Sequence, residues 1–240
     1  MRVYLNEISG LWQAISSMYM SKRTWSRSRE EDTKKLYGRL YDSFGLCRDM
    51  VDARDAEEMD KQISILLKWA PIHITMTKFL DFSFSVEGLH RGGQDDLDSH
   101  AKRMDNRILR SSTRLATYGA VKSDWYKDKI LTTDEALELQ GIKLPEELCI
   151  NGVEYVRAVN GYVRKEAKDD KDVKRGLYML SIPSDCTFRI NCSEFAHLLK
   201  QRDMNSHAHP ELKLVVEMML AQIQQHIPQL TREWFYSVEN

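Results

Sequence analysis

The 240-residue sequence lacks the cysteine patterns that mark metal centres and disulfide scaffolds. Its cysteines form no C-x-x-C pair and no regular spacing: Cys47, Cys149, Cys186 and Cys192. The chain has no apolar run near the roughly 20 residues of a membrane-spanning helix. Residues 1–17 show no basic segment followed by an apolar one. These absences predict reduced cysteines, a cytoplasmic location and no membrane partner.

No charge of one sign prevails either. The 35 lysines and arginines oppose 36 aspartates and glutamates, which gives a formal net charge of -1. Generic binders of nucleic-acid polymers or membrane surfaces need a clear basic excess, so we exclude both as partners. A local basic pocket for one small anion remains compatible with this balance. A chain of this length can bury about 70% of its unfolded surface, and it needs no structural metal to fold.

The hydrophobic pattern predicts an α+β fold in a single domain, residues 1–240, with a central, mostly antiparallel sheet flanked by helices. Helical periodicity indicates helices at about 30–54, 59–67, 95–114, 192–202 and 210–227. Alternating apolar residues indicate strands at 73–79, 82–88 and about 186–191. Residues 1–28 show no regular pattern, so we expect an irregular amino-terminal extension.

Two local signals predict turns and caps. Thr132 with Glu135 three residues later has capping-box spacing, and Gly141 should end the short helix that follows. Asn160-Gly161 stands between two β-rich runs and predicts a hairpin, at about 150–166.

The densest chemical feature is the arginine-rich stretch at residues 100–115. Its arginines recur at spacings of four, three and four, which on a helix would form one cationic stripe: Arg103, Arg107, Arg110 and Arg114. Ser112 lies within a Ser-Ser-Thr-Arg tetrad that presents hydroxyls and a guanidinium together. Such a set suits phosphate, because the arginine fork matches phosphate oxygens. The alternative is a solvated helix face paired with nearby aspartates.

Other candidate groups stand out by context. Arg175 precedes an apolar stretch into which it could point, and Arg202 ends a predicted helix, where a cation can also act as a cap. His197, His207 and His209 match no common zinc spacing, so we predict no metal. No G-x-S-x-G, P-loop or G-x-G-x-x-G motif is present.

Ordered landmarks between about residues 71 and 228 resemble the flavin-dependent thymidylate synthases. His73 is similar to that family's strand-initial histidine, and Ser112-Thr113-Arg114 matches the closing S-x-R of its signature RHRxxSxNExSxR. Two further segments resemble the family. One is Arg175 before an apolar stretch that ends in proline. The other is Asn191 to Arg202, which resembles the family's N-x-R-S-L-x-x-F-L-x-L-R. Ser206-His-Ala-His-Pro-Glu-Leu resembles the family's S-H-A-Q-W-E-I.

The chain departs from the family pattern in the first half of the signature. Lys102-Arg103-Met104 stands where the family has R-H-R, and Ser193 replaces an arginine. His209-Pro210 replaces glutamine-tryptophan.

The resemblance implies the thymidylate synthase-complementing-protein fold and methylation of dUMP to dTMP. Methylenetetrahydrofolate would supply the carbon, and FAD would relay reducing equivalents from NADPH. Arg202 would stabilise negative charge on the uracil ring, with Ser112 as a second catalytic group. Ser112, Arg114, Arg175 and Arg202 would bind the nucleotide. The implied flavin contacts are His73, Arg103, Arg107, Arg110, Asn191, His197 and His207. A homotetramer is also implied.

Two alternatives stay open. The altered signature is compatible with a non-catalytic or altered-specificity protein that binds a pyrimidine nucleotide on the same scaffold. The arginine-rich stretch is also compatible with an interaction module that takes no small ligand.

Overall fold

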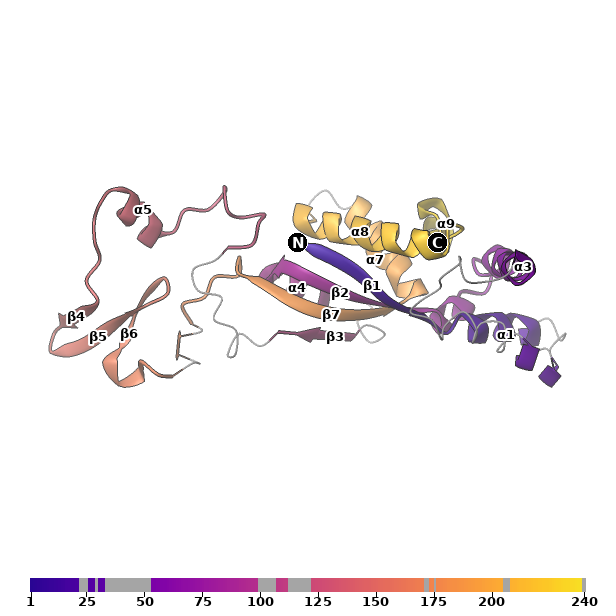
Figure 1. Ribbon diagram of the computed structural model, residues 1–240, viewed down its shortest axis with the longest axis horizontal. Coiled ribbons are helices and arrows are strands. Elements are labelled where there is room, and N and C mark those ends of the chain that lie inside the picture. Colours follow the sequence, from indigo (N-terminus) through magenta and orange to yellow (C-terminus); the bar gives the residue numbers. More distant parts are fainter. Residues whose placement is uncertain are drawn as a thin grey trace. The chain divides into compact units, whose positions relative to one another are not determined.

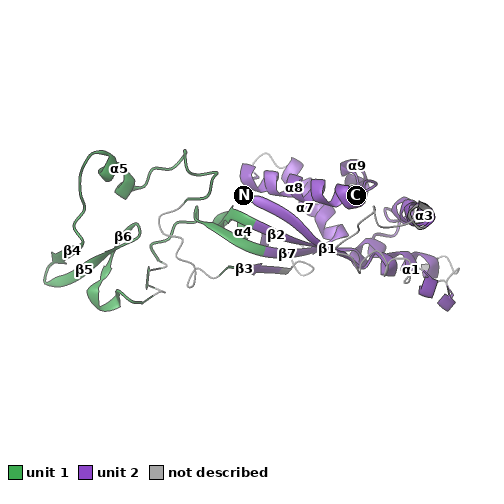
Figure 2. Cartoon of the chain, in the orientation of Figure 1, with its two compact units in different colours: residues 1, 87–95, 110–186 green, residues 2–86, 96–109, 187–240 purple. Residues whose placement is uncertain are grey.

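The computed structural model describes residues 1–21, 26–28, 30–32, 53–98, 107–111, 122–170, 173–174, 176–204 and 208–238. Contacts divide the chain into two compact units (Figure 2). Unit 1 comprises residues 1, 87–95 and 110–186, and unit 2 comprises residues 2–86, 96–109 and 187–240. No helix among the described residues is both long and apolar enough to cross a bilayer.

The predicted α+β class is confirmed (Figure 1). A four-stranded sheet has the order β1 (Arg2–Ser9), β2 (Asp81–His90), β7 (Pro183–Asn191) and β3 (Arg107–Arg110). A three-stranded antiparallel sheet has the order β4 (Glu147–Ile150), β5 (Val153–Ala158) and β6 (Gly161–Arg164). Helix α4 (Arg91–Asp98) has residues in both units. The described α-helices that lie wholly in unit 2 are α1 (Leu11–Ser21), α3 (Ala53–Trp69), α7 (Cys192–Met204), α8 (Pro210–His226) and α9 (Arg232–Val238). Unit 1 also holds α5 (Thr133–Leu139) and the 3-10 helix η4 (Lys165–Ala167), while the 3-10 helix η2 (Ile74–Phe79) belongs to unit 2.

The core of unit 2 is built around α7, which packs against α8, α9 and η2. Its Phe195 is fully buried, and its ring lies 5.8 Å from Phe82 of β2 and 5.1 Å from Phe235 of α9, both in edge-on contact. Phe84 of β2 stacks on the same ring at 6.4 Å. Helix α7 therefore lies between strand β2 and the carboxy-terminal helix, which explains why even its polar residues Ser193 and Glu194 are buried.

The expectation of an irregular amino terminus is wrong. Residues 2–9 form β1, and α1 follows after Gly10. The alternation of Val3 and Leu5 breaks at Ile8, so the segment carries no clean strand pattern, and pairing in the sheet decides its structure. Gly10 takes a φ of 77°, and a Cβ there would lie 1.6 Å from the carbonyl oxygen of Phe79. Only glycine fits this close approach.

The strand expected at 73–79 is also wrong, because residues 74–79 form the 3-10 helix η2. The Thr77 hydroxyl donates to the carbonyl of Ile74 at 2.6 Å, and the N–H of Leu80 donates to the carbonyl of Thr77 at 3.3 Å. Such local bonds from a threonine compete with strand pairing despite its β-branched side chain. The strand predicted from the alternation beyond Leu80 is confirmed, since β2 buries Phe82, Phe84 and Val86.

The helix predicted from Asp95 through Arg114 is wrong both at its start and at residues 107–110. Helix α4 begins at Arg91, four residues earlier than expected, and residues 107–110 form strand β3. The first-turn N–H groups of Arg91 and Gly92 donate to carbonyls of residues 182 and 180, which satisfies the helix start. Positions three apart in a strand lie on opposite faces, so positions 107 and 110 do not belong to one stripe.

Several local predictions are confirmed. Thr132 and Glu135 form the capping box of α5, and Gly141 follows its end with a φ of 72°. The helices predicted at 59–67, 192–202 and 210–227 correspond to α3, α7 and α8, and the strand at 186–191 lies within β7. Most of the helix predicted at 30–54 lies outside the described residues. Helix α9 was not predicted.

The predicted hairpin is confirmed, with a turn one residue earlier and a third strand. Ala158 pairs with Gly161, so the turn residues are Val159 and Asn160, with a φ of 61° at Asn160. A second turn at Asn151-Gly152 joins β4 to β5, with φ values of 52° and 77°. Positive φ at both central residues is what a type I′ turn requires, and the Asn-Gly pair is its strongest sequence signal.

Candidate functional site

Five of the predicted site residues have described side chains: His73, Arg110, Asn191, His197 and Arg202. Arg103, Ser112, Arg114, Arg175 and His207 lie outside the described residues, and only the backbone of Arg107 is described, in β3. Their assigned roles therefore stay predictions.

Arg202 lies in the last turn of α7 and is half-buried. Its Nη2 donates to the carbonyl oxygen of Asp96 at 3.3 Å. Its Nε is buried and has no hydrogen-bond partner among the described residues. Burial lowers the pKa of the guanidinium, but arginine stays charged at neutral pH. The structure thus shows a shielded cation with a donor that no described protein group uses.

Asn191 begins the same helix. Its side-chain oxygen accepts a hydrogen bond from the backbone N–H of Glu194 at 2.9 Å, and the residue is 5% exposed. This is the geometry of a helix amino-terminal cap, a position for which asparagine is among the best residues. Asn191 therefore fixes the start of α7, the helix that carries Arg202 at its other end.

His197 lies between these two ends of α7 and is half-buried. Arg202 lies five positions further along the helix, which places the two about 140° apart around the helix axis. The two side chains therefore leave α7 in different directions.

His73 follows the end of α3 and is exposed. Its imidazole stacks on the ring of Trp69, with the ring centroids 6.4 Å apart. Its backbone N–H donates to the carbonyl of Trp69 at 3.1 Å, so the chain turns tightly here. The result is a surface pair of aromatic rings that a planar ligand could contact.

Arg110 is in unit 1 and is 19% exposed in its side chain. Its Nη1 donates to a carboxylate oxygen of Asp95 at 2.6 Å, and its Nη2 donates to the carbonyl of Gln94 at 3.1 Å. The neighbouring Ser111 hydroxyl donates to the carbonyl of Asp185 at 2.9 Å. The charge of Arg110 is thus compensated within the protein, as the alternative of arginines paired with nearby aspartates predicts.

Sequence analysis missed a set of buried polar side chains in unit 1. The amide of Gln94 is fully buried and donates to the carbonyl of Ser184 at 2.8 Å. Its side-chain oxygen has no hydrogen-bond partner among the described residues, and neither do the hydroxyls of Ser123, Ser181 and Ser184. Buried polar atoms of this kind bind ordered water or ligand atoms. Serine and glutamine carry no sequence pattern that would reveal this set.

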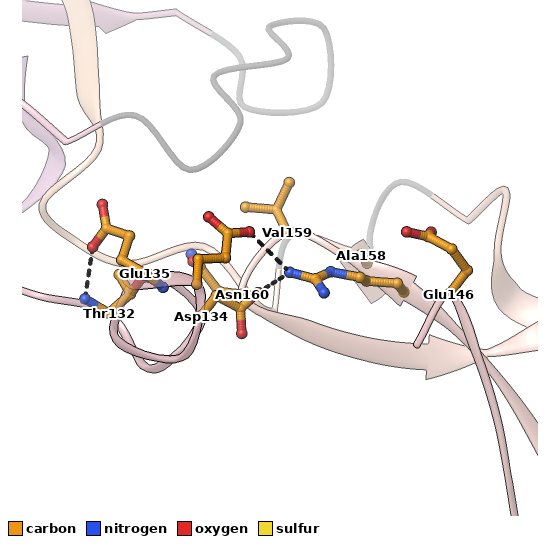
Figure 3. A pocket seen from close by; sticks show the side chains of 9 residues that line it. Thr132, Asp134, Glu135, Glu146, Ala158, Val159 and Asn160 are labelled. Carbon is orange, nitrogen blue, oxygen red and sulfur yellow. Dashed lines mark hydrogen bonds and ion pairs between the residues drawn. The ribbon is translucent and has the colours of Figure 1, made fainter. Parts of the chain in front are cut away.

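A pocket of about 340 Å³ lies between α5 and the hairpin of unit 1 (Figure 3). Arg157 is part of its lining and pairs with Asp134 at 3.2 Å and with Glu138 at 3.6 Å. Glu135 and Glu146 add two more carboxylates to the lining. The excess of carboxylates over this one arginine disfavours a nucleotide phosphate in this pocket.

No protein-family model matches the sequence, and a search of curated proteins gives no match. The fold does resemble solved structures of the flavin-dependent thymidylate synthase ThyX from Helicobacter pylori in complex with FAD and dUMP. One gives a TM-score of 0.55 over 100% of both chains at 14% identity. Another gives 0.57 over 98% of this chain and 99% of that chain, also at 14% identity.

A UMP/dUMP methylase, PolB from Streptomyces cacaoi bound with 5-Br dUMP, is more weakly similar. Its TM-score is 0.49 at 13% identity, over 98% of this chain and 94% of that chain. The fold assignment rests on the two ThyX structures, and the family resemblance in the sequence is confirmed at the level of fold.

Proposed function

We propose that the chain is an FAD-dependent, thymidylate synthase-like methyltransferase. It converts dUMP to dTMP with methylenetetrahydrofolate as carbon donor and NADPH as reductant. The observation that supports this most is the likeness, over the full length of both chains, to a ThyX structure that contains FAD and dUMP. The ordered landmarks in the sequence, from His73 to Arg202, support it independently.

Arg202 is the described residue whose environment suits the catalytic role best. Methylation at C5 requires electron density on the uracil ring, and a cation beside the ring stabilises the negative charge that develops. A half-buried guanidinium does this more effectively than an exposed one, because the local dielectric is lower. In this proposal Ser112, Arg114 and Arg175 bind the sugar and phosphate.

The described residues fit FAD only in part. The exposed imidazole of His73, stacked on the half-buried Trp69, offers an aromatic surface that suits a planar ring, so His73 fits the flavin contact assigned to it. Asn191 and Arg110 do not fit theirs, since Asn191 caps α7 and Arg110 pairs with Asp95. FAD, when bound, would supply the reducing equivalents of the reaction.

This partial fit favours a second candidate, a protein that binds a pyrimidine nucleotide without flavin chemistry. The pairing of Arg110 with Asp95 at 2.6 Å is the specific observation behind it. An arginine already neutralised by the protein has less to offer a flavin phosphate. Arg202 would bind the nucleotide in both candidates.

Three measurements on the purified protein separate the candidates. Calorimetric titration with dUMP tests nucleotide binding, absorbance between about 350 and 500 nm tests for flavin, and tritium release from 5-tritiated dUMP tests C5 chemistry. We expect all three to be positive for the methyltransferase. Nucleotide binding alone supports the second candidate, and a flat dUMP titration refutes both. Light scattering would test the homotetramer that we also propose.

A matched pair of variants tests the role of Arg202. Arg202→Ala removes a charged donor, so we expect dUMP to bind about 10- to 100-fold more weakly. Arg189→Ala is the control, because Arg189 is in the same unit but pairs with Asp81 at 2.8 Å on a half-exposed strand position. Equal affinities in the two variants would remove Arg202 from the nucleotide site.

A further inference from the structure

Asp203, the residue after Arg202, is an acidic side chain at the carboxyl end of α7. The last carbonyls of a helix carry partial negative charge and lack intrahelical donors, so a carboxylate there is unfavourable unless a cation compensates it. Arg232 and Tyr236 of α9 provide this compensation. The Nη1 of Arg232 and the hydroxyl of Tyr236 both donate to the same carboxylate oxygen of Asp203. The side chain of Asp203 is 18% exposed, which strengthens both bonds.

Arg232 also reaches a third helix. Its Nη2 donates to both carboxylate oxygens of Glu217 on α8. The bonds from Glu217 and Asp203 raise the pKa of Arg232, and burial raises the pKa of Tyr236, so both remain donors at neutral pH. We call these four side chains the α9 cluster: Asp203, Glu217, Arg232 and Tyr236. The cluster joins the last turn of α7 to both neighbouring helices.

Helix α9 is itself firmly placed. Phe235 is fully buried against Phe195 of α7. On its other side, the indole N–H of Trp234 donates to the carbonyl of Leu67 in α3 at 2.9 Å. The cluster therefore holds Asp203 against a fixed support.

Arg202 forms few bonds to the described residues. Its one hydrogen bond to a described residue, the carbonyl of Asp96, is 3.3 Å long, and its Nε has no described partner. The direction of its guanidinium consequently depends on the backbone of the last turn of α7. That turn is the one that the α9 cluster holds.

We propose that Arg232 and Tyr236 are positioning residues for Arg202. Through Asp203 they fix the last turn of α7, and with it the direction from which the Arg202 guanidinium meets the nucleotide. The inference rests on the proposed function, since that function is what assigns Arg202 to the nucleotide.

A double-mutant cycle on the full chain tests the proposal, with dUMP affinity as the readout. Arg232→Met keeps much of the side-chain length and removes the charge. We expect it to weaken dUMP binding about tenfold in the native background and to have no further effect in the Arg202→Ala background, because coupled residues are not additive. Arg232→Lys should restore most of the affinity, and Tyr236→Phe should act in the same direction as Arg232→Met but less strongly. Equal losses in both backgrounds would overturn the proposal.

Amide hydrogen exchange provides a second test of the proposal that needs no ligand. Arg232→Met should speed exchange in the last turn of α7, residues 201–204, and leave the first turn, capped by Asn191, unchanged. Unchanged exchange in the last turn overturns the positioning role. If the wild-type chain binds no dUMP but exchange responds as stated, the proposed function fails while the cluster's hold on the Arg202 turn stands.

Discussion

The carboxy-terminal helix α9 had no clear sequence signal, so its packing merits a direct test by Phe235→Ala. Phe235 is fully buried, with edge-on contacts to Phe195 at 5.1 Å and to Trp234 at 5.2 Å. Removing a buried phenylalanine costs about 3–5 kcal/mol through lost transfer free energy and the cavity left behind. The two aromatic contacts favour the upper part of that range, so we expect a loss of about 4 kcal/mol or more of unfolding free energy.

Urea denaturation followed by circular dichroism measures this loss. For a chain of this size, 4 kcal/mol corresponds to a drop in Tm of about 8–16 °C. Phe79→Ala is the matched control, because the same atoms are removed from a side chain that is 50% exposed. We expect the control to lose about 1 kcal/mol. Equal losses in the two variants would refute the packing of α9 into the core.

The remaining predictions concern backbone conformation, helix capping and thiol ionisation. Gly10→Ala should cost about 3 kcal/mol or more, since its Cβ would lie 1.6 Å from a backbone oxygen. Gly141→Ala, at a similar φ of 72° with no atom within 4 Å, should cost only about 1–2 kcal/mol. Thr132→Ala should lower stability by about 1 kcal/mol and speed amide exchange in α5. Burial raises the pKa of Cys186 from 9.0 to about 11, so iodoacetamide at about pH 8 should modify exposed Cys149 and spare Cys186. Because the unfolded thiol ionises first, unfolding free energy should fall between about pH 9 and 11. Burial also raises the pKa of the Cys192 thiol, so Cys186→Ala should make that slope shallower without abolishing it.

The elements that could be predicted are those whose signal is local. The capping box at Thr132 and the apolar face of α8 act within one helix, and both are confirmed. The Asn151-Gly152 turn was missed although its signal is equally local, so a stricter search for Asn-Gly pairs would have found the third strand.

The elements that could not be predicted depend on partners distant in sequence. Strand β1 forms although its apolar alternation breaks at Ile8, because it pairs in the sheet. The arginines of 103–114 have helical spacing, yet residues 107–110 form an edge strand. Helix α9 depends on Phe235 filling a space beside α7, which no sequence window contains.

Because residues 107–110 form a strand and not a helix, the predicted cationic stripe does not form there, and the arginines must be compared one by one. Their spacing in the sequence made Arg110 equivalent to the other arginines, but in the structure it pairs with Asp95. Arg157 and Arg189 likewise bind carboxylates, at 3.2 Å and 2.8 Å. Arg202 is half-buried and forms no direct ion pair with a described residue, although the charge of Asp96 interacts with it favourably. A half-buried cation without a direct ion pair among the described residues is costly, and an anionic ligand would offset that cost. The environment of Arg202 is therefore a stronger argument for nucleotide binding than the number of arginines in the sequence.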